Sequence, residues 1–205
     1  MFNFYRTFIY FFILTFLVIF SVYGEDAKLN KIEVIVNEQA ITNYDVIQRL
    51  KINAILRQVE INNANYEVFI NTVVDELISE ILKMEKILEY NINVAEEELK
   101  DHENRLLNNL SFNKDQFKNI LSENAVNYEN FISYVETDLK WQKLIYGLYF
   151  RMTSITEIEI KELRNKTPEL TNEIAKEIII QKQLDLKSDK LIQDMKNEAT
   201  IEFRS

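Results

Sequence analysis

The sequence predicts a mostly α-helical protein with a small β-element that joins its two ends. Only two glycines and one proline occur among the 205 residues, whereas sheet-rich folds need many turn residues with positive φ. Apolar residues recur at helical spacing in two long segments, near residues 66–89 and 128–150. Strand-like alternation is confined to residues 31–37 and to the last residues of the chain. We therefore expect several long helices around one hydrophobic core.

The first 24 residues are typical of a secretory signal peptide. Arg6 provides a basic start, an unbroken apolar run extends from Thr7 to Phe20, and Val22 and Gly24 precede an acidic pair. This order predicts export to the periplasm and cleavage after Gly24. The alternative is a retained anchor in the inner membrane, because the apolar run lies near the lower limit of about 17 residues for a spanning helix.

The composition excludes several classes of function. The chain has no cysteine, which rules out disulfides, thiolate nucleophiles and zinc sites built on thiolates. Its formal net charge of −9 is opposite to the charge that a nucleic-acid-binding protein needs. No glycine-lysine motif of the kind that cradles ATP phosphates occurs. We therefore predict no nucleic acid, no ATP and no cofactor.

The order of elements predicts one domain over residues 25–205. Residues 31–37 alternate as a half-buried strand, with a short return at 39–41, and Thr42 with Asp45 forms a capping box for the first helix. Further helices are predicted near 66–89, 95–108, 114–122, 128–150, 156–166 and 171–197, and a strand near 200–204. A lone terminal strand needs a partner, so we expect the last strand to pair with the strand at 31–37. The final helix and strand (171–205) should then pack against the segment 31–166 and complete one domain with it.

The helix near 128–150 is apolar on two faces. One face carries Tyr128, Phe131, Ile132, Val135, Leu139, Tyr146 and Tyr149, and the other carries Tyr134, Trp141, Leu144, Ile145 and Leu148. Such a helix is either buried between neighbours or offers one face to an apolar ligand. We interpret Tyr134, Trp141, Ile145 and Leu148 as one wall of a peptide-binding groove; the alternative is that this face is core.

No constellation of residues indicates catalysis or metal binding. The one histidine, His102, lies on a polar helix and is expected to be solvated. The acidic run Glu96 to Glu98, with Asp101, fits the first turn of a helix, where carboxylates favour the positive end of the dipole. A Ser-His-Asp triad would lack its glycine-supported oxyanion loop. We predict no catalytic site and no metal site.

The chain resembles the SurA family of periplasmic chaperones in its core domain. The resemblance begins with Val34 to Asn37 and Ala40 to Val46, the strand, turn and capped helix typical of the family. It continues through Val94 to Leu99 and Gln116 to Leu121, then Asn127-Tyr128 to Phe131, Val135 and Leu139, and ends at Ile155 to Glu157. Residues 174–204 are similar to the family's C-terminal helix and strand.

The chain departs from the family pattern near Pro168. Family members carry one or two parvulin-type prolyl isomerase domains between the segment that ends near Asn165 and the final helix, whereas a few residues occupy that place here. A domain needs about 100 residues, so we expect no isomerase. Asn124 stands where the family favours glycine, and Ala95 where it favours an N-cap hydroxyl.

The resemblance implies a chaperone that holds unfolded outer-membrane protein precursors without ATP and that could contact the outer-membrane assembly machinery. Two other readings stay open: a non-catalytic adaptor or structural module that docks on a folded partner, and an enzyme whose site the motifs do not reveal.

Overall fold

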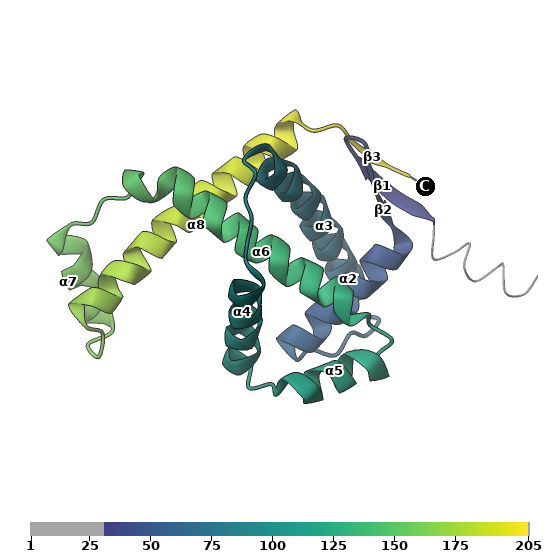
Figure 1. Cartoon of the computed structure of the whole chain (residues 1–205), viewed down its shortest axis with the longest axis horizontal. Helices are drawn as coiled ribbons and strands as arrows, with labels where there is room; N and C mark the ends of the chain where they lie inside the picture. The colour runs from purple at the N-terminus through teal and green to yellow at the C-terminus, as the bar shows by residue number, and fades with distance from the viewer. Residues whose placement is uncertain (1–30, 205) are drawn as a thin grey trace, which may run out of the picture.

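The computed structural model describes residues 31–204, which form helices around one small sheet (Figure 1). The predicted signal peptide, residues 1–24, lies outside the described residues. The elements in chain order are β1 (Ile32–Val36), β2 (Gln39–Thr42), α2 (Asn43–Arg57), α3 (Tyr66–Glu89), α4 (Glu96–Asn109), α5 (Lys114–Glu123), α6 (Tyr128–Tyr149), the 3-10 turn η1 (Phe150–Met152), α7 (Glu157–Lys166), α8 (Asn172–Glu198) and β3 (Ile201–Phe203). The mostly helical fold class is confirmed.

The sheet joins the two ends of the described chain, as the sequence predicts. Its three strands are antiparallel in the order β2-β1-β3. Residues 201 and 203 of β3 pair with Val36 and Val34 of β1. β1 and β2 form a hairpin whose turn places Asn37 at φ 54°, a conformation that asparagine tolerates better than most residues.

Local capping chemistry sets the helix ends. Thr42 and Asp45 form the predicted capping box of α2, and Thr156 and Glu159 form that of α7. The left-handed residue at the end of α5 is not the asparagine that stands where the family favours glycine. Asn124 has a φ of −92°, and the left-handed residue is the following Ala125, at φ 52°. The Asn124 side chain donates a hydrogen bond to the Ile120 carbonyl at 2.8 Å.

The core consists of three main hydrophobic clusters. The first lies between the sheet, α2 and α3, and includes Val34 and Val73. The second joins α2, α4, α5 and α6 around Phe117 and Phe131, whose ring centroids are 4.7 Å apart. The third joins α3, α6 and α8 and contains Ile87, Trp141, Leu144, Ile145 and Leu184. α6 therefore crosses the whole body and contributes to two of the clusters.

An arm made of α7 and the N-terminal half of α8 projects from this body (Figure 1). Its small cluster of Ile160, Ala175 and Ile179 holds α7 against α8. The connection between them runs from Lys166, the last residue of α7, to Asn172, the first of α8. Within residues 31–204, none of the helices is long and apolar enough to cross a membrane.

Truncating Trp141 tests whether the third cluster holds α6 against α8. Trp141 is 3% exposed, and its indole N–H donates to Ser188 Oγ at 2.8 Å. We expect Trp141→Ala to lower the free energy of unfolding by about 3–5 kcal/mol, measured by urea denaturation. Tyr146→Ala, at a 51% exposed position of the same helix, should cost less than about 1 kcal/mol. Equal effects of the two variants would contradict the assignment.

Candidate functional site

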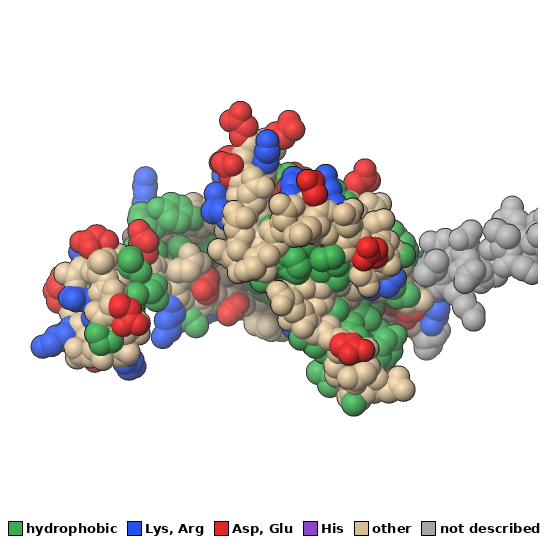
Figure 2. All heavy atoms as spheres, turned by 90° about the horizontal axis from the view of Figure 1, so that it is seen from below, with side chains coloured by type: hydrophobic (Ala, Val, Ile, Leu, Met, Phe, Trp, Pro, Cys, Tyr) green, Lys and Arg blue, Asp and Glu red, His purple; other side chains and the backbone are tan. Residues whose placement is uncertain are grey.

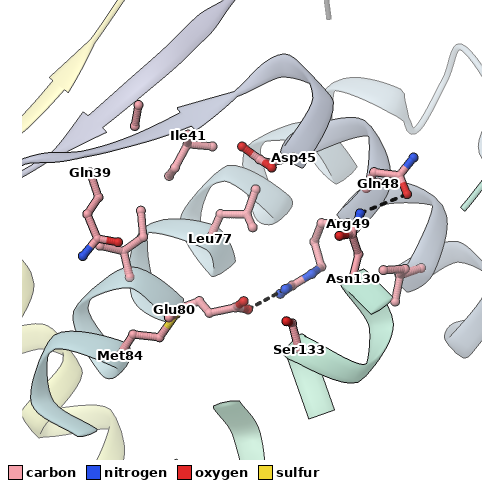
Figure 3. Close-up of a pocket in the computed structure, with 13 residues that line it drawn as sticks. Gln39, Ile41, Asp45, Gln48, Arg49, Leu77, Glu80, Met84, Asn130 and Ser133 are labelled. Carbon is pink, nitrogen blue, oxygen red and sulfur yellow. Dashed lines mark hydrogen bonds and ion pairs between the residues drawn. The ribbon is translucent and has the colours of Figure 1, made fainter. Parts of the chain in front are cut away.

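A pocket of about 250 Å³ opens between β2, α2, α3 and α6 (Figure 3). Its apolar lining comes from Ile41, Ile52, Leu77, Ile81 and Met84. The rest of the pocket lining is the small residue Ala40 and a set of polar and charged residues, namely Gln39, Asp45, Gln48, Arg49, Glu80, Asn130 and Ser133. We call this the hairpin pocket. An apolar lining with a few polar groups is the usual make-up of a ligand pocket.

An ion pair forms part of the wall of the hairpin pocket. Arg49 of α2 and Glu80 of α3 lie 2.5 Å apart, with side chains 7% and 18% exposed. The guanidinium also lies 4.4 Å from the ring centroid of Tyr134 on α6, which is within cation–π range. Arg49 therefore connects three helices, and its charge is compensated where little water can reach it.

Gln48, the residue before Arg49, fixes α2 to the start of α6. Its side-chain amide donates to the Ala125 carbonyl at 3.0 Å, and its carbonyl oxygen accepts from the Asn127 backbone N–H at 2.9 Å. The Asn130 amide donates to the same oxygen at 3.3 Å (Figure 3). Because these bonds satisfy buried polar groups, the α6 side of the hairpin pocket is held in place.

A second pocket of about 460 Å³ lies on the other side of the ion pair, among α2, α3, α4, α6 and α8. Arg49 and Glu80 line both pockets and form the wall between them. Lys83 also lines the second pocket, and burial lowers the pKa of its amine although the nearby Asp138 and Glu80 act in the opposite direction. Burial likewise raises the pKa of Tyr134.

The charges around the second pocket are mostly satisfied within the protein. Glu76 accepts from Asn53 and Arg57, at 2.5 and 3.0 Å. Asp138 accepts from Gln142 at 2.7 Å and lies 3.3 Å from His102 Nε2. Both carboxylates therefore have hydrogen-bond partners within the protein. Among residues 31–204 there is also no cluster of three or more histidines and carboxylates that could hold a metal ion.

The four predicted peptide-binding residues do not share one accessible face. Trp141 and Ile145 are 3% and 4% exposed and belong to the third cluster, where Leu148 packs half-buried against them. Tyr134 is half-buried and lies under Arg49 in the second pocket. In this structure, Trp141 and Ile145 behave as core residues, because α8 covers the face of α6 that the sequence left open. That they contact a client stays a prediction.

Two expectations for polar residues can also be compared with the structure. His102 is not freely solvated, since its side chain is 16% exposed and faces Asp138. The acidic run begins α4 as predicted. Glu98 accepts from the Ala95 backbone N–H at 2.9 Å and from Lys143, and both bonds lower the pKa of its carboxyl. Glu98 thus supplies the carboxylate half of a capping box, while the hydroxyl half is missing at Ala95.

Sequence reasoning missed the residues that shape the hairpin pocket. Gln48 and Arg49, which line this pocket, are each 6% exposed, whereas the sequence indicated only the cap of their helix. One signal was present: Arg49 lies three residues after Val46 and next to Leu50, inside the apolar stripe of α2. A charged residue in such a stripe is almost never fully buried unless it is paired, so Arg49 called for a buried acidic partner.

Breaking the Arg49–Glu80 pair should destabilise the protein more than breaking an exposed pair. Arg49→Met leaves the Glu80 carboxylate without its partner, and we expect a loss of about 3 kcal/mol in the free energy of unfolding. Arg49→Met combined with Glu80→Leu should recover most of this loss. Arg57→Met is the matched control, because its pair with Glu76 is half exposed and should be worth less than about 1 kcal/mol. Urea denaturation of all four proteins measures these differences.

The lowered pKa of Lys83 predicts a pH-dependent stability difference. Below its pKa in the folded protein, Lys83 is charged in both states and burial penalises the folded one. Between that pKa and the unfolded value of 10.5, the folded protein sheds the proton and the penalty fades as pH rises. Lys83→Met should therefore be more stable than the natural chain at pH 7, by an amount that shrinks toward pH 10.5. A difference independent of pH would contradict this reading.

Comparisons with known proteins identify similar sequences. Residues 1–145 match the model of the SurA-like N-terminal domain. The chaperone SurA of Saccharophagus degradans is 23% identical over 138 residues, which are 67% of this chain and 32% of that protein. A solved structure of a SurA-like chaperone, from work on PEB4 and Cj1289 of Campylobacter jejuni, is 23% identical and covers 68% of this chain and 51% of its own, with a TM-score of 0.36.

The chain thus spans about a third of the length of the curated relative. The family match includes β1 to α5 and most of α6, and all residues that line the hairpin pocket lie within it. Since the matched region is more than half of the chain, the protein belongs to the family of SurA-like N-terminal domains.

Proposed function

We propose that this protein is an ATP-independent periplasmic chaperone that binds unfolded outer-membrane protein precursors and has no prolyl isomerase activity. The observation that carries the proposal is the hairpin pocket, whose lining lies entirely inside the region shared with the family. The curated relative is itself described as a chaperone. Export to the periplasm rests on the predicted signal peptide, and contact with the assembly machinery on the family resemblance.

The hairpin pocket suits short apolar stretches of an unfolded chain. Leu77, Ile81 and Met84 follow each other along one face of α3 and line the pocket together. Met84 is 41% exposed, and a flexible thioether side chain adapts to differently shaped apolar groups. Arg49 and Glu80 of the pocket wall are paired with each other, and Asp45 accepts hydrogen bonds from Thr42, so these charges impose little preference on the client.

The lack of isomerase activity is proposed from the short α7–α8 connection. The family places its isomerase domains at this point of the chain, and here Lys166 and Asn172 bracket five residues. Tyr134 and Leu148 of α6 are both half-buried, and we retain them as proposed client contacts. Trp141 and Ile145 could contact a client only if α8 moved away from α6.

Suppression of aggregation tests the proposed function. The chain from Glu25 to Ser205, mixed with an unfolded outer-membrane porin and without nucleotide, should suppress light scattering at near-stoichiometric ratios. Met84→Glu places a charge at the pocket mouth and should weaken suppression several-fold. Leu88→Glu is the matched control, because Leu88 lies one turn further along α3, is 73% exposed and does not line the pocket.

No suppression by the folded protein would refute the chaperone proposal. Saturable binding to one folded periplasmic protein, with none to unfolded porin, would favour the adaptor reading instead. Equal loss in both glutamate variants would show that clients bind elsewhere on α3.

A further inference from the structure

The strand β3 leaves one edge of the sheet open. The Asn37 backbone N–H donates to the Thr200 carbonyl at 2.8 Å, and the Arg204 N–H donates to the Glu33 carbonyl at 2.9 Å. Residues 200 and 204 therefore direct their backbone groups toward β1. Because this direction alternates along a strand, the N–H and C=O groups of Ile201 and Phe203 point away from β1. No strand within residues 31–204 pairs with this edge.

An uncovered aromatic side chain lies at the same edge. Ile201 and Phe203 are opposite Val36 and Val34, which are 0% and 1% exposed, so all four lie on the face of the sheet that carries the core. Ile201 packs against the first cluster. Phe203 is 71% exposed, although cross-strand neighbours are what normally cover such a ring. A further strand beside β3 would supply both the missing hydrogen bonds and the missing neighbour.

The opposite edge of the sheet is less suited to pairing. On β2, the Thr42 backbone N–H donates to the Asp45 carboxylate at 2.8 Å, and α2 begins at the next residue. By the same alternation, Ala40 is the one residue of β2 whose backbone groups remain directed outward. The edge at β3 therefore offers the longer run of unpaired groups.

The charged side chains on and next to β1 and β3, on the face away from the core, are paired with each other. On the other face of the sheet, Lys31 lies 3.8 Å from Glu33, and Arg204 lies 2.7 Å from Glu202. These pairs sum to no net charge. Recognition would therefore rest on backbone hydrogen bonds and on contact with the Phe203 ring.

We propose that the edge at β3 binds an extended peptide segment as a fourth strand, with an apolar or aromatic side chain of the peptide against Phe203. This inference deepens the proposed function, on which it rests: the ligand is a stretch of unfolded client in which apolar and polar residues alternate. Strand addition is a general mode of peptide recognition in which the backbone supplies the affinity. A second copy is a poorer occupant, because two strands of three residues would bury far less than the roughly 1,000 Å² expected of a specific interface.

Backbone methylation of a peptide provides the first test. The probe is a fluorescent seven-residue peptide in which phenylalanine and threonine alternate, with two copies N-methylated at either the odd or the even residues. An added strand directs only one of these sets of N–H groups at the protein. One methylated copy should therefore bind the natural chain about tenfold or more weakly than the other, as expected for the loss of one or two hydrogen bonds. Equal binding of the two copies would overturn the proposal.

Paired variants of the protein provide the second test. Phe203→Pro removes an N–H that β1 does not use and should abolish the difference between the methylated peptides. Phe203→Val loses the same ring but keeps the N–H, so it should retain that difference. Leu88→Val is the matched control, because it trims an exposed apolar side chain that lies outside both the sheet and the hairpin pocket, and it should bind like the natural chain. A difference between the methylated peptides that persists in Phe203→Pro would overturn the choice of edge.

The two proposals can fail separately. If porin aggregation is suppressed while the methylated peptides bind equally, the chaperone proposal stands and strand addition is refuted. If light scattering shows that the natural chain is dimeric and Phe203→Pro is monomeric, a second copy occupies the edge and the peptide proposal is overturned.

Discussion

The pairing of β3 with β1 is the constraint on which the rest of the structure depends. It fixes the C-terminal end of α8 beside the sheet, where Met195 and Ala199 pack against the first cluster. Lys196 also bonds Asp75 of α3 at 2.6 Å. From there α8 runs across α3 and α6, and Leu184 covers Trp141. Three residues of strand would not be stable alone, so the strand pairing and the packing of α8 support each other.

The same return of the chain explains why α6 is buried on two faces. The first half of α6 packs on α2 and α5 through Phe131, and the second half packs on α8 through Trp141. Little of its apolar surface is left for a ligand. Tyr146 is the large hydrophobic residue of α6 that stays exposed, and exposed apolar side chains elsewhere include Met84 at the hairpin pocket and Phe203 at the sheet edge. On the face shown in Figure 2, those near the end of the arm are scattered among charged side chains.

Buried charge determines the shape of the candidate site. Arg49 lies where α2, α3 and α6 meet, and Glu80 and the Tyr134 ring compensate it there. An unpaired charge at this depth would cost several kcal/mol, so the three helices are held at the spacing that keeps the pair intact. This spacing leaves the hairpin pocket on one side and the larger pocket on the other. Client binding and strand addition, as proposed, use surfaces that this scaffold leaves open.

The sequence by itself determined the helices, the hairpin and the capping boxes at Thr42 and Thr156, because each depends on the local spacing of residues. It also determined the pairing of the terminal strands, because the chain offers few other strands with which they could pair. It did not determine which apolar face of α6 is covered, since Trp141 on a wheel looks the same whether α8 or a ligand packs on it. The sequence also did not identify Glu80 as the partner of Arg49, because Glu80 lies 31 positions further along the chain. Only the tertiary structure decided these points, since burial depends on contacts between elements distant in sequence.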